Sequence, residues 1–178
     1  VSDVAKGAAL MTGTKVSYRT VSAYADLLSV PAMEELMMEA MQEAEKPEYA
    51  DDDYEYAARF AADQASPSID TTILPADQSI NLGSTDVGDV SWQVPTGLIG
   101  VTTEAAGCAL HTWQIVAQGK SPLAHKGMHY AARILFAAAK KLYESPERCA
   151  LIQDDYQNVI GHRTYQSMLP DSVKPGDF

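Results

Sequence analysis

The expected fold is decided by the stretch Gly83–Met128, which reads GSTDVGDVSWQVPTGLIGVTTEAAGCALHTWQIVAQGKSPLAHKGM. Its middle, VPTGLIGVTT at residues 94–103, is apolar on both faces and bounded by turn residues. That pattern is typical of a strand buried between layers of helices. Ser121 and Pro122 then suit the N-cap and first turn of a long helix that reaches about Tyr143. A buried strand followed by a long helix favours an α/β fold.

Hydrophobic spacing predicts further elements on both sides of this stretch. Helical spacing predicts helices over residues 3–12, 31–45, 54–65 and 147–158. Alternating β-branched residues predict short strands over 14–21 and 71–74. The predicted fold class is therefore α/β, with helices on both sides of an incomplete sheet.

Two of the predicted helices carry apolar stripes that we expect to be buried. In the helix predicted over residues 31–45, the stripe consists of Met33, Leu36, Met37 and Met41. An adaptable methionine-rich binding surface is the alternative interpretation. In the helix that begins at Pro122 the expected stripe consists of Met128, Ala132, Leu135, Ala139 and Leu142.

Composition excludes several classes of function. The 178 residues suit one globular domain, and the net charge of −11 argues against binding to nucleic acid or to anionic lipid. Cys108 and Cys149 make no disulfide framework. No apolar run reaches the roughly 20 residues of a membrane span, and no signal peptide is recognisable. We expect a cytoplasmic protein, in which Val1 lies inside a longer chain.

His111 is the best candidate for a functional residue. It follows the expected strand through a loop that starts at Gly107, so its ring would lie at the edge of the sheet. A neutral imidazole is a good ligand for zinc or manganese. A histidine hydrogen-bonded within a partly buried loop is the alternative. Cys108 and His111 form a C-x2-H pair, but a structural zinc site needs a second pair, and none of matching spacing exists.

The other polar candidates are weaker. Asp86 and Asp89 would lie near the N-terminus of a helix, where carboxylates cap the helix or bind a metal. His125 and His129 share a helix face but lack the glutamate of a zinc-protease motif, since Lys126 occupies its place. Lys120 and Lys126 could neutralise a substrate carboxylate. None of these residues completes a catalytic set.

A resemblance emerges from GSTDVGDVSWQVPT, followed by HTWQIVAQGKSPLAHKGM. Together with VAKGAALMTGT, PAMEELM and YQSMLPDSVKP, these strings resemble the dinuclear metallohydrolases of the p-aminobenzoyl-glutamate hydrolase type. That family also includes aminoacylase, carboxypeptidase G and the indole-acetyl-amino-acid hydrolases. The resemblance runs through the whole chain.

The resemblance implies a fold and a division into domains. Residues 1–27 would be the last helix and strand of an inserted dimerisation, or lid, domain. Residues 28–178 would be the C-terminal part of a three-layer α/β/α catalytic domain of the zinc-aminopeptidase type. The full-length protein would form a homodimer, or a hetero-oligomer with a paralogous subunit.

The resemblance also implies roles for single residues. His111 matches the family's last metal-ligand histidine. Asp86 matches the acidic residue of a Gly-Ser-Glu/Thr-Asp turn near the metals, so Ser84 and Thr85 of that turn would lie near the metal or the substrate. Cys108, three residues before His111, would lie there as well. The remaining ligands and the glutamate base would lie upstream of Val1.

The implied reaction is hydrolysis of p-aminobenzoyl-glutamate or a related N-acyl amino acid. Two zinc or manganese ions would polarise the amide carbonyl and activate a water in the full-length enzyme. We expect the isolated chain to be inactive and to bind catalytic metal weakly or not at all. A dipeptide or indole-acetyl-amino-acid hydrolase and a non-catalytic binding module on the same scaffold are the alternatives.

Overall fold

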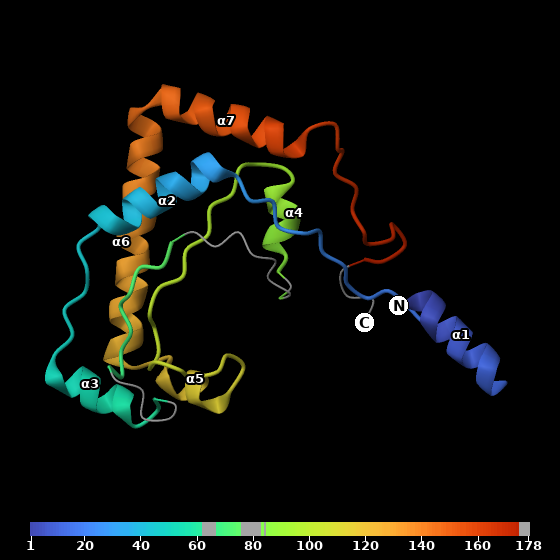
Figure 1. Cartoon of the computed structure of the whole chain (residues 1–178), viewed down its shortest axis with the longest axis horizontal. Coiled ribbons are helices and arrows are strands. Elements are labelled where there is room, and N and C mark those ends of the chain that lie inside the picture. Colours follow the sequence, from blue (N-terminus) through green and yellow to red (C-terminus); the bar gives the residue numbers. More distant parts are fainter. Residues whose placement is uncertain (62–66, 76–82, 84, 175–178) are drawn as a thin grey trace.

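The fold was obtained as a computed structural model, which describes residues 1–61, 67–75, 83 and 85–174. The regular structure of these residues is entirely helical (Figure 1). The helices are α1 Ser2–Thr12, α2 Pro31–Glu43, α3 Asp51–Ala58, α4 Val87–Ser91, α5 Trp113–Gln118, α6 Pro122–Glu144 and α7 Pro146–Ile160. The expected α/β fold, with a sheet between two layers of helices, is therefore wrong for the described part of the chain.

The error lies in the expected strands over 14–21, 71–74 and 94–103, which have no regular structure. A strand is defined by a ladder of hydrogen bonds to a neighbouring strand, and alternation of side chains cannot supply that neighbour. Residues just before 71–74 do approach the chain at and after the end of 94–103, where Ala106 N–H donates to the Ser68 carbonyl over 2.8 Å and the Thr102 hydroxyl donates to the Asp70 carbonyl. These two bonds do not make a ladder.

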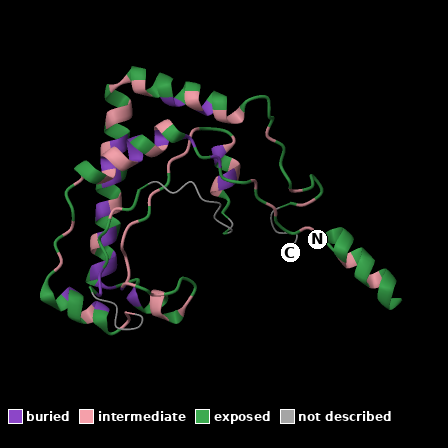
Figure 2. Ribbon diagram, in the orientation of Figure 1, coloured by how far each residue is buried: buried purple, intermediate pink, exposed green. Residues whose placement is uncertain are grey.

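The main hydrophobic core lies where α2 crosses α6 and α7 packs beside both (Figures 1 and 2). Met33, Leu36 and Met37 of α2 are buried there, and Met41 packs against the cluster, so the first stripe was predicted correctly. Ile134 of α6 and Ile152 and Tyr156 of α7 belong to the same cluster.

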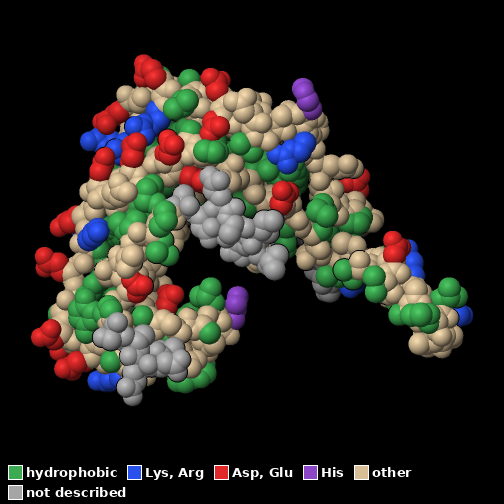
Figure 3. All heavy atoms as spheres, viewed as in Figure 1, with side chains coloured by type: hydrophobic (Ala, Val, Ile, Leu, Met, Phe, Trp, Pro, Cys, Tyr) green, Lys and Arg blue, Asp and Glu red, His purple; other side chains and the backbone are tan. Residues whose placement is uncertain are grey.

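The rim of this core carries ion pairs. Arg148 binds Glu39 over 2.7 Å, and Lys141 binds Glu43 over the same distance. Lys and Arg side chains gather at the α2–α6–α7 corner in Figure 3, amid the acidic side chains that dominate the chain's charge. Because the pairs are partly exposed, each contributes at most about 1 kcal/mol.

The long helix α6 begins as expected, since the Ser121 hydroxyl accepts a hydrogen bond from the N–H of Ala124. Its buried face differs from the expected stripe and consists of Leu123, Ala124, Gly127, Tyr130, Ile134 and Ala138. Met128 and Leu135 are instead 55% and 52% exposed. Because α6 is apolar on two faces, periodicity alone could not decide which face meets α2.

A second, smaller cluster joins α3 to the start of α6 and consists of Ala57, Ile69, Ala105 and Leu123. An ion pair between Lys126 and the buried Asp53 closes it on one side. Asp53 also accepts the N–H of Ala50, over 2.8 Å, at the start of α3. This cluster includes Ala105, which lies in the loop that carries the candidate residues Cys108 and His111.

The first helix stands apart from these clusters (Figure 1). No residue of α1 is buried, and Gly13 ends the helix in the left-handed conformation, with φ 65°. None of the helices in the described ranges is both long and apolar enough to cross a membrane.

Candidate functional site

The loop over residues 104–112 carries the leading candidate, His111, and is held from three sides. The carbonyl oxygen of the Gln118 side chain accepts the N–H of Ala105 over 2.8 Å. Ala106 N–H donates to Ser68, and the Cys108 thiol donates to the carbonyl of Phe60 over 3.2 Å. The loop is therefore attached to α5, to the 67–75 segment and to the end of α3.

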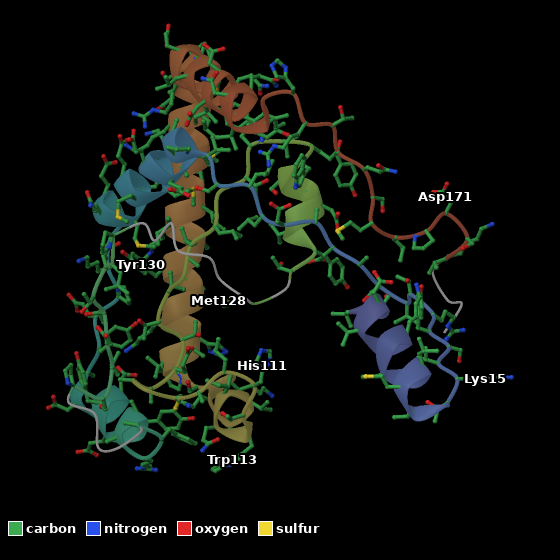
Figure 4. All side chains as sticks on the ribbon, turned by 45° about the vertical axis from the view of Figure 1, so that its right-hand side comes forward. Lys15, His111, Trp113, Met128, Tyr130 and Asp171 are labelled. Atoms are coloured by element: carbon green, nitrogen blue, oxygen red, sulfur yellow. The ribbon has the colours of Figure 1, made fainter. Side chains whose placement is uncertain are left out.

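His111 lies at the outer end of this loop, immediately before α5 (Figure 4). It has a φ of 61° and, within the described ranges, is the residue other than glycine with a positive φ. A left-handed backbone at a non-glycine residue is uncommon and marks a position that its surroundings impose. The side chain is exposed and makes no hydrogen bond to any described residue, so its ring nitrogens are available to an external ligand.

Aromatic contacts fix the helix that follows His111. The Trp113 ring meets the Phe60 ring edge to face, with centroids 6.3 Å apart, although Trp113 remains 71% exposed. The Phe60 ring in turn packs in a tilted arrangement against the Tyr56 ring, with centroids 5.3 Å apart. The His111 backbone is thus bounded by the pinned loop on one side and by an anchored helix on the other.

Cys108, expected near the metal or the substrate, turns toward the protein. Besides donating to Phe60, its sulfur accepts a hydrogen bond from the Gln118 amide over 3.4 Å. A thiol that is engaged in this way positions the loop. Its proximity to a metal stays a prediction.

The GSTD turn precedes the short helix α4. Thr85 accepts the N–H of Val87 with its hydroxyl, over 3.3 Å, and Asp86 is exposed at the N-cap position with no side-chain capping bond. Ser84 lies outside the described residues. Asp86 therefore offers a carboxylate that no described residue uses.

Asp89 is structural. Its carboxylate accepts the N–H of Ala25 over 3.2 Å and the hydroxyl of Tyr165 over 2.9 Å, so it ties two distant segments to α4. The hydrogen bond to Asp89 raises the pKa of Tyr165. A Cβ at Gly88 would lie 2.0 Å from the Ala25 carbonyl oxygen, and this close approach explains why a glycine occupies this position of α4.

The structure does not assemble the candidates into one centre. Helices α4 and α5, which follow Asp86 and His111, lie well apart in Figure 1. Among the described residues, no three His, Cys, Asp or Glu side chains are placed to hold a metal ion. Each of these residues can therefore supply one ligand to a metal ion, but together the described residues do not form a complete metal site.

The remaining candidates also separate. His125 and His129 are exposed on α6. Lys126, considered as a partner for a substrate carboxylate, binds Asp53 instead, and its ammonium lies 5.6 Å from the centroid of the Tyr49 ring. Lys120 is exposed and makes no hydrogen bond or ion pair with a described residue.

Sequence reasoning missed Gln118, whose fully buried side chain organises the candidate loop. Its amide also donates to the carbonyl of Gln114 over 3.1 Å, so every polar group of the side chain has a partner. A glutamine at the end of the amphipathic segment before Gly119 is typical of an exposed residue, and the sequence holds no signal for the contact with Ala105.

Comparison with known proteins adds what the geometry leaves open. No family model matches the chain, and no solved structure matches it. The chain is similar to a subunit of p-aminobenzoyl-glutamate hydrolase from Escherichia coli (strain K12), with 29% identity over 204 aligned positions. The expected resemblance is confirmed. The match covers 98% of this chain and 42% of that relative, so the chain spans less than half of the relative's length.

Proposed function

We propose that this chain forms part of a metal-dependent amidohydrolase that cleaves p-aminobenzoyl-glutamate or a related N-acyl amino acid. The observation that carries the proposal is the similarity to the p-aminobenzoyl-glutamate hydrolase of Escherichia coli across nearly the whole chain. That relative is a hydrolase by name, and its substrate joins an aromatic acyl group to an amino acid through an amide. The same type of substrate is proposed here.

Within this chain, His111 is the proposed metal ligand. Its exposed ring has no partner among the described residues, and its left-handed backbone is bounded by the loop that Gln118 holds. Such positioning fixes the backbone from which the imidazole projects and so limits the region that its ring can reach. Asp86 is proposed to lie close to the metals or the substrate, because its carboxylate is likewise uncommitted.

The proposed site is completed by residues other than the described ones. One histidine cannot hold two divalent zinc or manganese ions, and no described cluster supplies the missing ligands. We therefore propose that further ligands and a general base come from protein segments that correspond to the unmatched part of the relative. Residues 1–27 would belong to a dimerisation domain and residues 28–178 to the catalytic domain.

The proposal is tested on the natural protein that contains this sequence. Its hydrolysis of p-aminobenzoyl-glutamate is measured beside a dipeptide and an indole-acetyl-amino acid. His111→Asn is expected to lower kcat/KM for the preferred substrate at least about 100-fold, the size of effect that follows loss of a metal contact. His162→Asn is the matched control, because His162 is exposed and its ring has no partner within the described ranges.

The outcome separates the candidate functions. Turnover of p-aminobenzoyl-glutamate that His111→Asn abolishes and His162→Asn retains supports the proposal. Preferred turnover of one of the other amides would reassign the substrate within the same chemistry. Absence of turnover for all three amides would contradict the hydrolase and favour a binding module.

A further inference from the structure

A pocket of about 190 Å³ lies away from the candidate site, between the end of α2, the segment before α3 and the middle of α6. Its walls include Lys46, Tyr49, Tyr54, Gly100, Thr102 and Tyr130. His111 is not among its lining residues. In Figure 4, Tyr130 projects from α6 on the side opposite to Met128, as the helical turn between them requires.

Three tyrosine rings supply the aromatic surface of this pocket. Tyr49 and Tyr54 meet edge to face, with centroids 6.3 Å apart and an angle of 71° between the rings. Tyr130 is fixed by a hydrogen bond from its hydroxyl to the carbonyl of Met41, over 2.8 Å. Aromatic side chains held in this way favour a further ring between them, stacked or edge to face.

The hydroxyl groups of the two outer tyrosines remain available. Neither Tyr49 nor Tyr54 uses its hydroxyl in a bond to a described residue. Burial, reinforced by the nearby Asp53 carboxylate, raises the pKa of Tyr49, so its phenol keeps its proton at neutral pH and can donate a hydrogen bond.

The pocket also has a cation at its rim. Lys46 is exposed, and its ammonium makes no ion pair within the part of the chain that the structure describes. Lys126, by contrast, is held by Asp53. The backbone N–H and C=O groups of Gly100, Val101 and Thr102 in the wall have no backbone partner among the described residues. Lys46 is the charged side chain among the lining residues, so the pocket suits an anionic ligand.

We propose that this pocket binds a single-ring aromatic carboxylate, with the ring among the tyrosines and the carboxylate at Lys46. The size is appropriate, because an apolar cavity of about 150 Å³ in another protein holds benzene, and 190 Å³ leaves room for one carboxylate. The site is independent of the proposed hydrolase function, since it shares no residue with the candidate site.

The test uses benzoate as the probe and the natural protein that contains this sequence as the target, with binding measured by isothermal titration and by saturation-transfer NMR. Benzoate is expected to bind with a dissociation constant on the order of 1 mM, typical of so small a ligand. Benzyl alcohol, which lacks the charge, and hexanoate, which lacks the ring, are each expected to bind more weakly.

Two variants probe the two halves of the site. Lys46→Met is expected to weaken benzoate binding about threefold to fivefold, the size of one partly exposed ion pair. Lys15→Met is its control, because Lys15 lies on the distant segment after α1 (Figure 4). Gly100→Leu is expected to weaken binding more than about tenfold by filling the pocket. A Cβ at Gly100 meets no atom within 4 Å, so the variant should fold, and the same holds for its control, Gly7→Leu.

The proposal is overturned if benzoate shows no saturable binding up to about 20 mM. It is equally overturned if Gly100→Leu binds benzoate as well as Gly7→Leu does, or if hexanoate matches benzoate. Equal effects of Lys46→Met and Lys15→Met would place the anion elsewhere on the surface and overturn the assignment of Lys46.

Discussion

The α2–α6–α7 corner and the candidate loop over residues 104–112 are stabilised by different means. In the corner, Leu36 and Ile134 are fully buried among other apolar side chains. In the loop, two backbone N–H groups and the Cys108 thiol donate single hydrogen bonds to Gln118, Ser68 and Phe60, while the side chain of His111 stays exposed. The corner therefore supplies stability, and the loop presents chemical groups to solvent.

This difference shows where each kind of substitution acts. Burial of apolar area stabilises the fold as a whole, so changes in the corner should lower the free energy of unfolding. The loop depends on a few polar contacts, each worth about 1 kcal/mol net, so changes there should alter local geometry at a smaller global cost.

Ile134→Ala should have the largest effect, because it leaves a cavity in the corner. We expect the free energy of unfolding to fall by about 2–5 kcal/mol, measured by urea denaturation. Leu135→Ala is the control on the next residue of α6, where the side chain is 52% exposed, and should cost less than about 1 kcal/mol. Equal losses at the two positions would contradict the observed orientation of α6.

Gln118→Leu should destabilise the protein by about 1–3 kcal/mol, because the buried N–H of Ala105 loses its acceptor. Gln114→Leu on the same helix is the control, since the Gln114 side chain makes no bond to a described residue. Hydrogen exchange of the Ala105 amide should accelerate in the first variant only. Unchanged exchange would show that another group holds the loop.

The Asp53–Lys126 pair should make stability depend on pH in the acid range. Burial alone would raise the pKa of Asp53, but the hydrogen bonds from Lys126 and the Ala50 backbone outweigh it and lower the pKa below its usual value. The stabilisation is therefore complete above the unfolded carboxyl pKa of about 4 and is lost as the pH falls through the lower folded value.

Comparison of urea unfolding at neutral and acid pH checks this expectation. The acid-induced loss should be smaller in Lys126→Met than in the unmodified chain, by about 1 kcal/mol. Lys120→Met, at an exposed lysine, should leave the loss unchanged. If Lys126→Met keeps the full loss, other carboxyl groups cause the acid sensitivity.

Most of the helices could be predicted because their signals are local, although α5 was not. Pro31 and Ser121 with Pro122 mark starts that the structure confirms, and the stripe of α2 is buried as expected. The strands could not be predicted reliably, because extended residues become a strand only when a partner lies beside them. The segment 94–103 instead passes close to α6, where a Cβ at Gly127 would lie 2.1 Å from the Thr102 carbonyl oxygen.

The candidate site was accessible to sequence analysis only in part. The position of His111 after a small-residue loop and the similarity to a hydrolase both follow from the sequence. The contacts that fix the loop do not, because Gln118, Phe60 and Ser68 meet it from separate parts of the chain. Nor does spacing reveal that Asp89 binds Ala25 and Tyr165.

The most direct test of the central claim is the metal content of the natural protein that contains this sequence, purified as wild type, His111→Asn and His162→Asn. If His111 is one ligand of a centre completed by other segments, the wild type and His162→Asn should retain equal amounts of zinc or manganese. His111→Asn should lose at least one of the ions. Equal metal content in all three proteins would contradict the assignment of His111.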